Sequence, residues 1–277
     1  MDGRTMPAGP RPAAPAGAAR WLALAPGRRE WDLLVNLVAR HLRLAYGGSA
    51  TGVLWGLLIP LALLVIYNWV FTRVIRFDFP HFAAFLFCGM LPWNWFHTTI
   101  RSGLLSLVES RDLVRRPGFP TGILPLVSVV GGGLVTALGY VVLAGFLVYD
   151  GFGLSLAILV LPFILALQLV FTWGLALVLA VVNTYFRDLE HLLTILLMGL
   201  FFLTPVFYRT DMAPPGMRWI YDVNPLARVM DATREILLAG RLPGLAETAG
   251  TALICLGVLA LGLLVFRRYR GALPDEV

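Results

Sequence analysis

Long stretches without a charged residue constrain the fold of this sequence more than any other feature. They cover residues 44–72, 82–100, 117–149, 151–186, 192–208 and 248–266. An α-helix needs about 20 apolar residues to cross the hydrocarbon core of a bilayer, where its backbone finds no other hydrogen-bond partners. The stretches therefore predict an all-α, polytopic membrane protein with six transmembrane helices. We place these spans at about 51–71, 82–103, 121–148, 154–182, 190–208 and 248–266.

The remaining segments divide the chain. Residues 1–27 are rich in Ala, Pro, Gly and Arg without periodicity, which predicts a disordered cytoplasmic tail. Residues 28–270 form the membrane domain. Residues 271–277 form a short C-terminal cytoplasmic tail.

A helical pattern precedes the first span, between residues 29 and 46. Trp31, Leu34 and Val38 repeat at helical spacing, while Arg40 lies on an opposite, basic face. This pattern predicts an amphipathic helix that lies in the headgroup region of the membrane.

The basic residues report the orientation of the chain. All 22 are arginines, and placing both termini in the cytoplasm puts 15 on the inner side and 7 on the outer side. This positive-inside bias predicts a multi-pass protein of the bacterial inner membrane, with residues 109–118 inside and residues 209–247 outside. The arginines gather at the ends of apolar stretches, so the net charge of +6 does not indicate nucleic-acid binding.

The absence of lysine bears on energy coupling. A P-loop needs a lysine to reach the nucleotide phosphates, and this chain has none. ATP hydrolysis of the P-loop kind must therefore come from another polypeptide.

Residues 209–247 are too polar to cross a membrane and too regular for a simple loop. Asn224 followed by Pro225 predicts a helix start, because Asn caps the first N–H groups and Pro suits the first helical position. An apolar stripe follows, opposite a polar face that includes Arg228 and Arg234. With a shorter helix before it, this pattern predicts two short amphipathic helices that dip into the outer membrane face.

The segment between the second and third spans carries a compact group of charges. The group consists of Glu109, Arg111, Asp112, Arg115 and Arg116. We expect the helix of the second span to continue beyond the membrane and to stop at Pro117-Gly118. Two interpretations fit: an ordinary positive-inside loop, or a docking element for a partner protein.

Four motifs occur in a specific order along the chain. They are SLVESRDLVRRPGFP at 106–120, NTYFRDLEHLL at 183–193, LTPVFY at 203–208 and NPLARVMDATREILLAG at 224–240. Together they resemble the polysaccharide-exporting branch of the ABC-transporter permeases, the membrane subunits that export O-antigen, capsule and teichoic-acid chains. The resemblance covers about residues 30–270.

The resemblance implies a function and roles for particular residues. It implies a homodimer of this chain, two copies of an ATP-binding subunit that holds ATP and Mg, no cofactor in this chain, and a lipid-linked polysaccharide substrate. Residues 29–46 would be the interface helix, residues 109–118 the coupling helix, and residues 211–240 two periplasmic gate helices. A second contact with the ATPase would consist of Tyr185, Phe186, Arg187 and Asp188.

Aromatic residues are frequent in three of the predicted spans. Most suit the aromatic belt at the membrane interface. Aromatic faces also suit the apolar C–H surfaces of sugar rings, and we expect a sugar path lined by Trp69, Trp93, Trp95 and Tyr208. Pro92 and Pro205 are expected to bend their helices.

Other function classes find fewer supporting residues. The span interiors hold no Asp, Glu or Arg, and only His97, near the end of the second span, comes close to a site for ion-coupled transport. The four histidines lack metal-ligand spacing, and we expect no metal site. A lipid-modifying membrane enzyme would have only Cys88 or Cys255 as nucleophile, without a base nearby in sequence. Within transport, export of a drug or small lipid is the alternative.

Overall fold

The structure is a computed structural model, which describes residues 28–46, 58, 61–63, 65–66, 69–74, 81–153, 155–212, 214, 216 and 218–277. The tail predicted at 1–27 lies outside the described residues, and so does most of the first span predicted at 51–71.

Every regular element in the described part of the chain is a helix, which confirms the predicted all-α class for those residues. The elements are α2 (Arg28–Tyr46), η1 (Val70–Val74), α4 (Phe82–Glu109), α5 (Arg111–Val114), α6 (Ile123–Tyr149), η2 (Leu156–Val160), α7 (Leu161–Tyr185), α8 (Leu189–Leu203), η3 (Thr210–Met212), α9 (Arg218–Val223), α10 (Pro225–Leu237), α11 (Leu245–Tyr269) and α12 (Leu273–Glu276).

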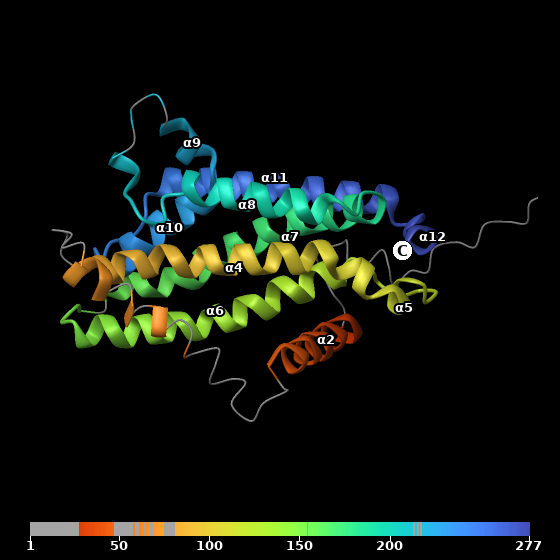
Figure 1. Cartoon of the computed structure of the whole chain (residues 1–277), viewed down its shortest axis with the longest axis horizontal. Coiled ribbons are helices and arrows are strands. Elements are labelled where there is room, and N and C mark those ends of the chain that lie inside the picture. The colour runs from red at the N-terminus through yellow and green to blue at the C-terminus, as the bar shows by residue number, and fades with distance from the viewer. Residues whose placement is uncertain are drawn as a thin grey trace, which may run out of the picture.

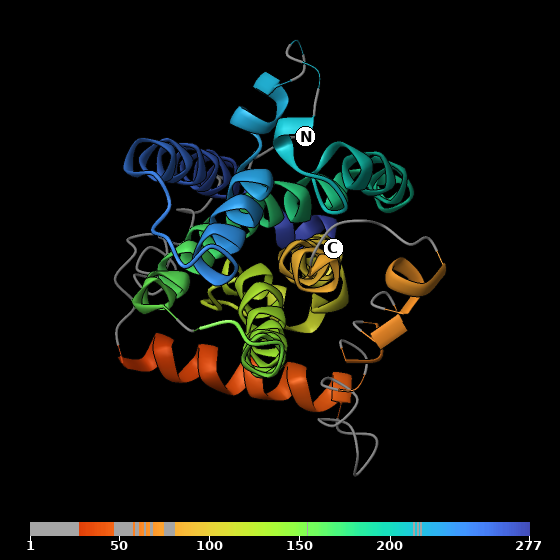
Figure 2. The same cartoon turned by 90° about the vertical axis from the view of Figure 1, so that its left-hand side faces the viewer.

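Four long helices, α4, α6, α7 and α11, run side by side as a bundle (Figure 1). α7 packs against the other three and against α10, so it occupies the middle of the molecule. α2 crosses beneath α6 almost at right angles to the bundle (Figure 2), the orientation expected of a helix that lies on a membrane surface.

Small residues set how closely these helices approach. A Cβ atom at Gly174 of α7 would lie 2.6 Å from the backbone of Leu259 on α11, and one at Gly262 would meet the carbonyl of Gly174. Membrane helices pack through small residues at such crossings, because lipid provides no hydrophobic drive for helix association. The indole Nε1 of Trp95 also joins α4 to α6 by donating to the Val129 carbonyl at 3.0 Å.

Three described helical segments are long and apolar enough to cross a membrane. They are Ile123–Tyr149, Leu156–Tyr185 and Leu245–Tyr269, which match the predicted third, fourth and sixth spans. α4 is long enough, at 28 residues, but less apolar. The count of six spans is therefore not established by the structure.

The helix within the fifth predicted span, 190–208, is shorter than that span. α8 is a 15-residue helix that ends at Leu203, and Thr204 adopts an extended conformation. The reason is Pro205, because the residue before a proline is disfavoured in the α region. The proline predicted to bend this helix terminates it instead.

The short helices and the turns between the long helices lie at two opposite ends of the bundle (Figure 1). One end holds α5, α12 and the turn between α7 and α8. The other holds α9, α10 and the turn after α6. The residues predicted to be cytoplasmic and those predicted to be periplasmic therefore separate in space, while the side of the membrane each end faces stays a prediction.

Candidate functional site

The charged segment after α4 is two elements rather than one continuous helix. α4 ends at Glu109, Ser110 interrupts it, and the four-residue α5 follows before Gly118 turns the chain with a φ of 80°. The expected helix running to Pro117-Gly118 is therefore corrected. The break makes α5 a separate short helix at the tip of the molecule.

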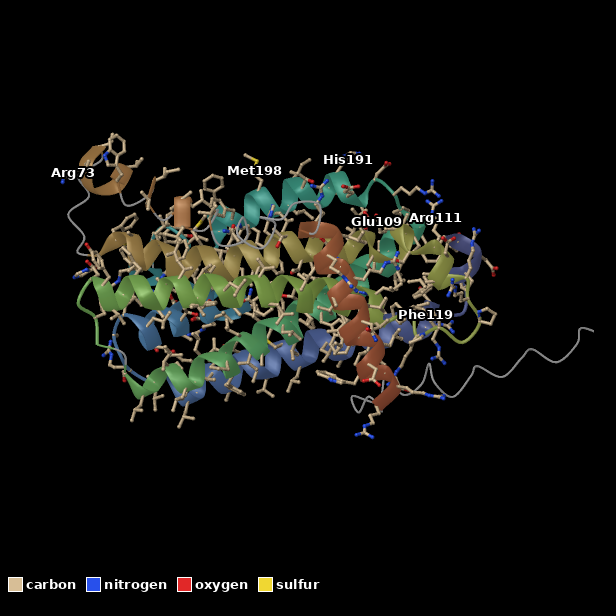
Figure 3. All side chains as sticks on the ribbon, turned by 90° about the horizontal axis from the view of Figure 1, so that it is seen from below. Arg73, Glu109, Arg111, Phe119, His191 and Met198 are labelled. Atoms are coloured by element: carbon tan, nitrogen blue, oxygen red, sulfur yellow. The ribbon has the colours of Figure 1, made fainter. Side chains whose placement is uncertain are left out.

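The charged side chains of α5 are exposed, and the helix is held in place by one buried side chain and one hydrogen bond. Its exposed charged residues and their neighbours are Glu109, Arg111, Asp112, Arg115 and Arg116, of which Figure 3 labels two. Val114 is 2% exposed and belongs to a buried cluster with Phe266 and Leu273. Arg115 donates from Nη2 to the main-chain oxygen of Val277 at 2.6 Å. The predicted C-terminal tail is thus packed against the bundle and holds α5.

A second exposed group lies at the same end, in the turn between α7 and α8. Its members are Tyr185, Phe186, Arg187 and Asp188. Phe186 is 69% exposed and lies directly beside the exposed charges of Arg187 and Asp188. Next to this turn, Glu190 accepts from Arg101 at 2.7 Å, which ties α8 to α4.

The amphipathic helix α2 is covered by the protein along only part of its apolar stripe. Leu34 and Val38 are buried against α6, whereas Trp31 is 57% exposed. His41 fits against α6 because Gly131 has no Cβ there, and burial lowers the pKa of its imidazole. The exposed part of the stripe remains available to lipid.

At the opposite end, the predicted start of α10 is confirmed. The Asn224 side chain accepts from the Leu226 N–H at 3.0 Å, and Pro225 occupies the first helical turn. Asn224 also donates from Nδ2 to the Thr204 hydroxyl at 3.2 Å, which fixes α10 to the end of α8.

α10 does not lie on the membrane face as its amphipathic pattern predicted. It packs against α4, α7 and α11, and most of its residues are buried (Figure 2). Its apolar stripe therefore contacts protein. The shorter preceding helix, α9, contacts α10 and buries only Tyr221 among its described side chains.

Arg234 is the largest departure from the sequence prediction, which placed it on a polar face. It is 7% exposed, and its guanidinium carbon lies 3.8 Å from the centre of the Phe85 ring. Nη2 donates to the Val206 carbonyl at 2.9 Å, and Nη1 lies 3.4 Å from Asp231. Arg228 instead pairs with Asp222 at 2.7 Å and Glu247 at 3.5 Å, joining α9, α10 and α11.

The four predicted channel aromatics lie in different surroundings. Trp93 and Trp95 are each 4% exposed and pack inside the single chain, whereas Trp69 is 60% exposed. Tyr208 is half-buried and donates from its hydroxyl to the Phe202 carbonyl at 2.8 Å. That they line a sugar path stays a prediction.

A cavity of about 540 Å³ beside α10 was not predicted from the sequence. Gln168 was not predicted as a structural residue either, although it is fully buried and donates to the Pro92 carbonyl at 2.7 Å. A signal for Arg234 was present, because it lies four residues after Met230 and three before Leu237 on the buried face. Among the described residues, no cluster of His, Cys, Asp or Glu has the arrangement of a metal site.

The sequence profile of the ABC-2 type transporter family matches residues 32–238. The chain belongs to this family: it is an ABC-2 membrane permease component and lacks the ATPase domain. The match covers most of α2 and includes α5 and α10, whereas α11 and α12 follow it.

Within this family, the chain is similar to three curated relatives. The O-antigen export system permease protein RfbA of Klebsiella pneumoniae is 33% identical over 213 residues, 76% of this chain and 82% of the relative. RfbA of Myxococcus xanthus is 32% identical over 249 residues, 88% of this chain and 95% of the relative. The polysialic acid transport protein KpsM of Escherichia coli is 26% identical over 243 residues, 83% of this chain and 91% of the relative.

Proposed function

We propose that this chain is the membrane subunit of a homodimeric, ATP-driven exporter that moves a lipid-linked polysaccharide across the bacterial inner membrane. The observation that carries the proposal is the similarity, along most of the chain, to permeases named for O-antigen export and polysialic acid transport. In this proposal the chain crosses the membrane six times with both termini in the cytoplasm. A separate ATP-binding subunit holds ATP and Mg.

The end that carries α5 is the proposed docking surface for the ATP-binding subunit. It combines exposed charges around α5 with the exposed Phe186 and Arg187 of the neighbouring turn. Charged groups at the rim and an aromatic group between them are typical of a specific protein interface.

α4 is the proposed link between this surface and the outer end. Its 28 residues correspond to about 42 Å at 1.5 Å per residue. At one end Ser110 joins it to α5, and at the other Phe85 lies under the Arg234 guanidinium of α10. A displacement of α5 by ATP-driven closure of the partner would therefore reach α10, the proposed gate, along one helix. The proposed gate residues are Asn224, Pro225, Arg228 and Arg234.

α8 is the proposed contact for the second copy and for lipid. It buries only two residues, Leu193 and Leu197, and its outer face is apolar. Met198, 69% exposed, points away from the bundle (Figure 3). Trp69 and Tyr208 keep surface that a sugar ring could contact. Trp93 packs against Phe201 of α8, whereas Trp95 packs against α6.

A charge reversal at the docking surface tests the coupling. Glu109→Arg combined with Arg111→Glu should weaken copurification with the ATP-binding subunit, or leave ATP hydrolysis uncoupled from export. The permease should still fold, because exposed charges contribute little to stability. The control is Arg218→Glu, an exposed position on α9 at the opposite end. Wild-type association and wild-type export in the double variant would contradict the docking proposal.

A further inference from the structure

The cavity beside α10 lies between α4, α7, α10 and α11 at the end opposite α5. Its charged lining comprises the arginines Arg209, Arg228, Arg234 and Arg241 and the carboxylates Asp231, Glu235 and Glu247. Arg228 also pairs with Asp222, which lies outside this lining, at 2.7 Å. The lining therefore brings several guanidinium groups together, and such groups bind anions.

The other wall of the cavity is apolar. Phe85 comes from α4, and Ile164 and Leu167 come from the first two turns of α7. α7 belongs to the candidate span Leu156–Tyr185, so this wall begins at the level where the chain enters the membrane. The cavity therefore places charged groups and apolar side chains side by side.

The buried guanidinium group of Arg234 lacks a full set of hydrogen-bond and ion-pair partners among the described residues. Its Nε finds no hydrogen-bond partner among the described residues, and its only carboxylate neighbour within 4 Å is Asp231 at 3.4 Å. Burial raises the pKa of Asp231, which shows that its negative charge is itself disfavoured there. An additional anion would therefore stabilise the guanidinium, because a buried charge without a full set of partners is costly.

We propose that this cavity binds a lipid through a phosphate group, with the phosphate at the arginines and the hydrocarbon chain along Phe85, Ile164 and Leu167. Guanidinium groups bind phosphate oxygens in a two-pronged, charge-assisted manner. A phosphodiester provides such oxygens on a lipid. Two sources share this chemistry: a phospholipid of the bilayer, or the lipid carrier of the exported glycan, and the second source rests on the proposed function.

Binding to the purified full-length chain in a neutral detergent tests the proposal. The probes are phosphatidylglycerol, a diacylglycerol with the same chains but no phosphate, and glycerol phosphate without chains. We expect phosphatidylglycerol alone to bind in native mass spectrometry. Arg241→Gln and Arg234→Gln should each weaken this binding about tenfold. Arg73→Gln is the control, since Arg73 lies at the same end without lining the cavity (Figure 3).

Unchanged phosphatidylglycerol binding in both variants, or equal binding of the diacylglycerol, would overturn the proposal. Equal binding of glycerol phosphate would overturn the lipid part of it. If Arg234→Gln does not fold, Arg241→Gln still decides, because Arg241 is exposed. Displacement of phosphatidylglycerol by a lipid-linked glycan would assign the site to the carrier, and bound lipid that resists it would assign the site to the bilayer. A negative result leaves the export function untouched, since export is measured by glycan translocation.

Discussion

At the end of the bundle that carries α10, single side chains provide hydrogen bonds that the backbone does not make itself. Asn224 does this twice, since its Oδ1 accepts from the Leu226 N–H and its Nδ2 donates to Thr204. The first bond caps α10, and the second connects α10 to the residue at which α8 ends. One side chain thus fixes both the start and the position of the proposed gate helix.

Replacing this residue tests its role. Asn224→Ala should destabilise α10 by about 1 kcal/mol, because loss of an N-cap costs about that much. Hydrogen exchange of the α10 amides measures the effect, which should appear as faster exchange confined to that helix and its neighbours. Asn36→Ala is the control, since Asn36 makes a single exposed bond within α2. Equal exchange of α10 in both variants would contradict the assigned role.

Of these single side chains, some could be assigned a role from the sequence and others could not. The cap at Asn224 was predictable, because capping depends on residues next to one another in the chain. The contacts of Arg234 with Phe85 and Val206 were not, since these two residues belong to segments distant in sequence. A charged residue on a helix is assigned to the polar face by default, although its long apolar stem permits burial.

At the scale of elements, the backbones of α7 and α11 approach each other closely where the two helices cross. Gly174 and Gly262 face each other there, and neither position has room for a Cβ atom. The space is limited by backbone atoms, which cannot move aside as a flexible side chain could. The approach of the two helices therefore depends on these glycines.

Alanine substitutions on α11 separate packing from helix propensity. Gly262→Ala should destabilise the protein by about 1–3 kcal/mol through overpacking. Gly257→Ala, on the same helix, adds a Cβ into open space and should be neutral or slightly stabilising, because Ala favours the helix. Thermal unfolding in detergent measures both. Equal stability of the two variants would refute the close crossing.

Charge-free stretches predicted α6, α7 and α11 well, because length and hydropathy suffice to define a span. They failed where a local signal interrupts the stretch. Pro205 shortens the fifth helix, and Ser110 separates α5 from α4. The packing of α10 between other helices required the tertiary structure, since its amphipathic pattern fits a membrane face equally well.

At the scale of the whole molecule, the two ends differ in a way that predicts topology. Arg116 lies next to α5 at one end and Arg218 on α9 at the other, and both are exposed. In intact cells, a membrane-impermeant maleimide should label Arg218→Cys but not Arg116→Cys. The native Cys88 and Cys255 are buried and should add no background. Labelling of the second variant alone would reverse the proposed orientation.

Translocation in reconstituted vesicles tests the central claim most directly. The permease and its ATP-binding subunit would be placed in proteoliposomes with a lipid-linked glycan, and the glycan emerging on the far side would be measured by enzymatic digestion. We predict translocation that requires ATP, both subunits and an unaltered docking surface at Glu109 and Arg111. Translocation of the lipid carrier or of a small lipid while the glycan stays behind would contradict the claim that this chain exports polysaccharide.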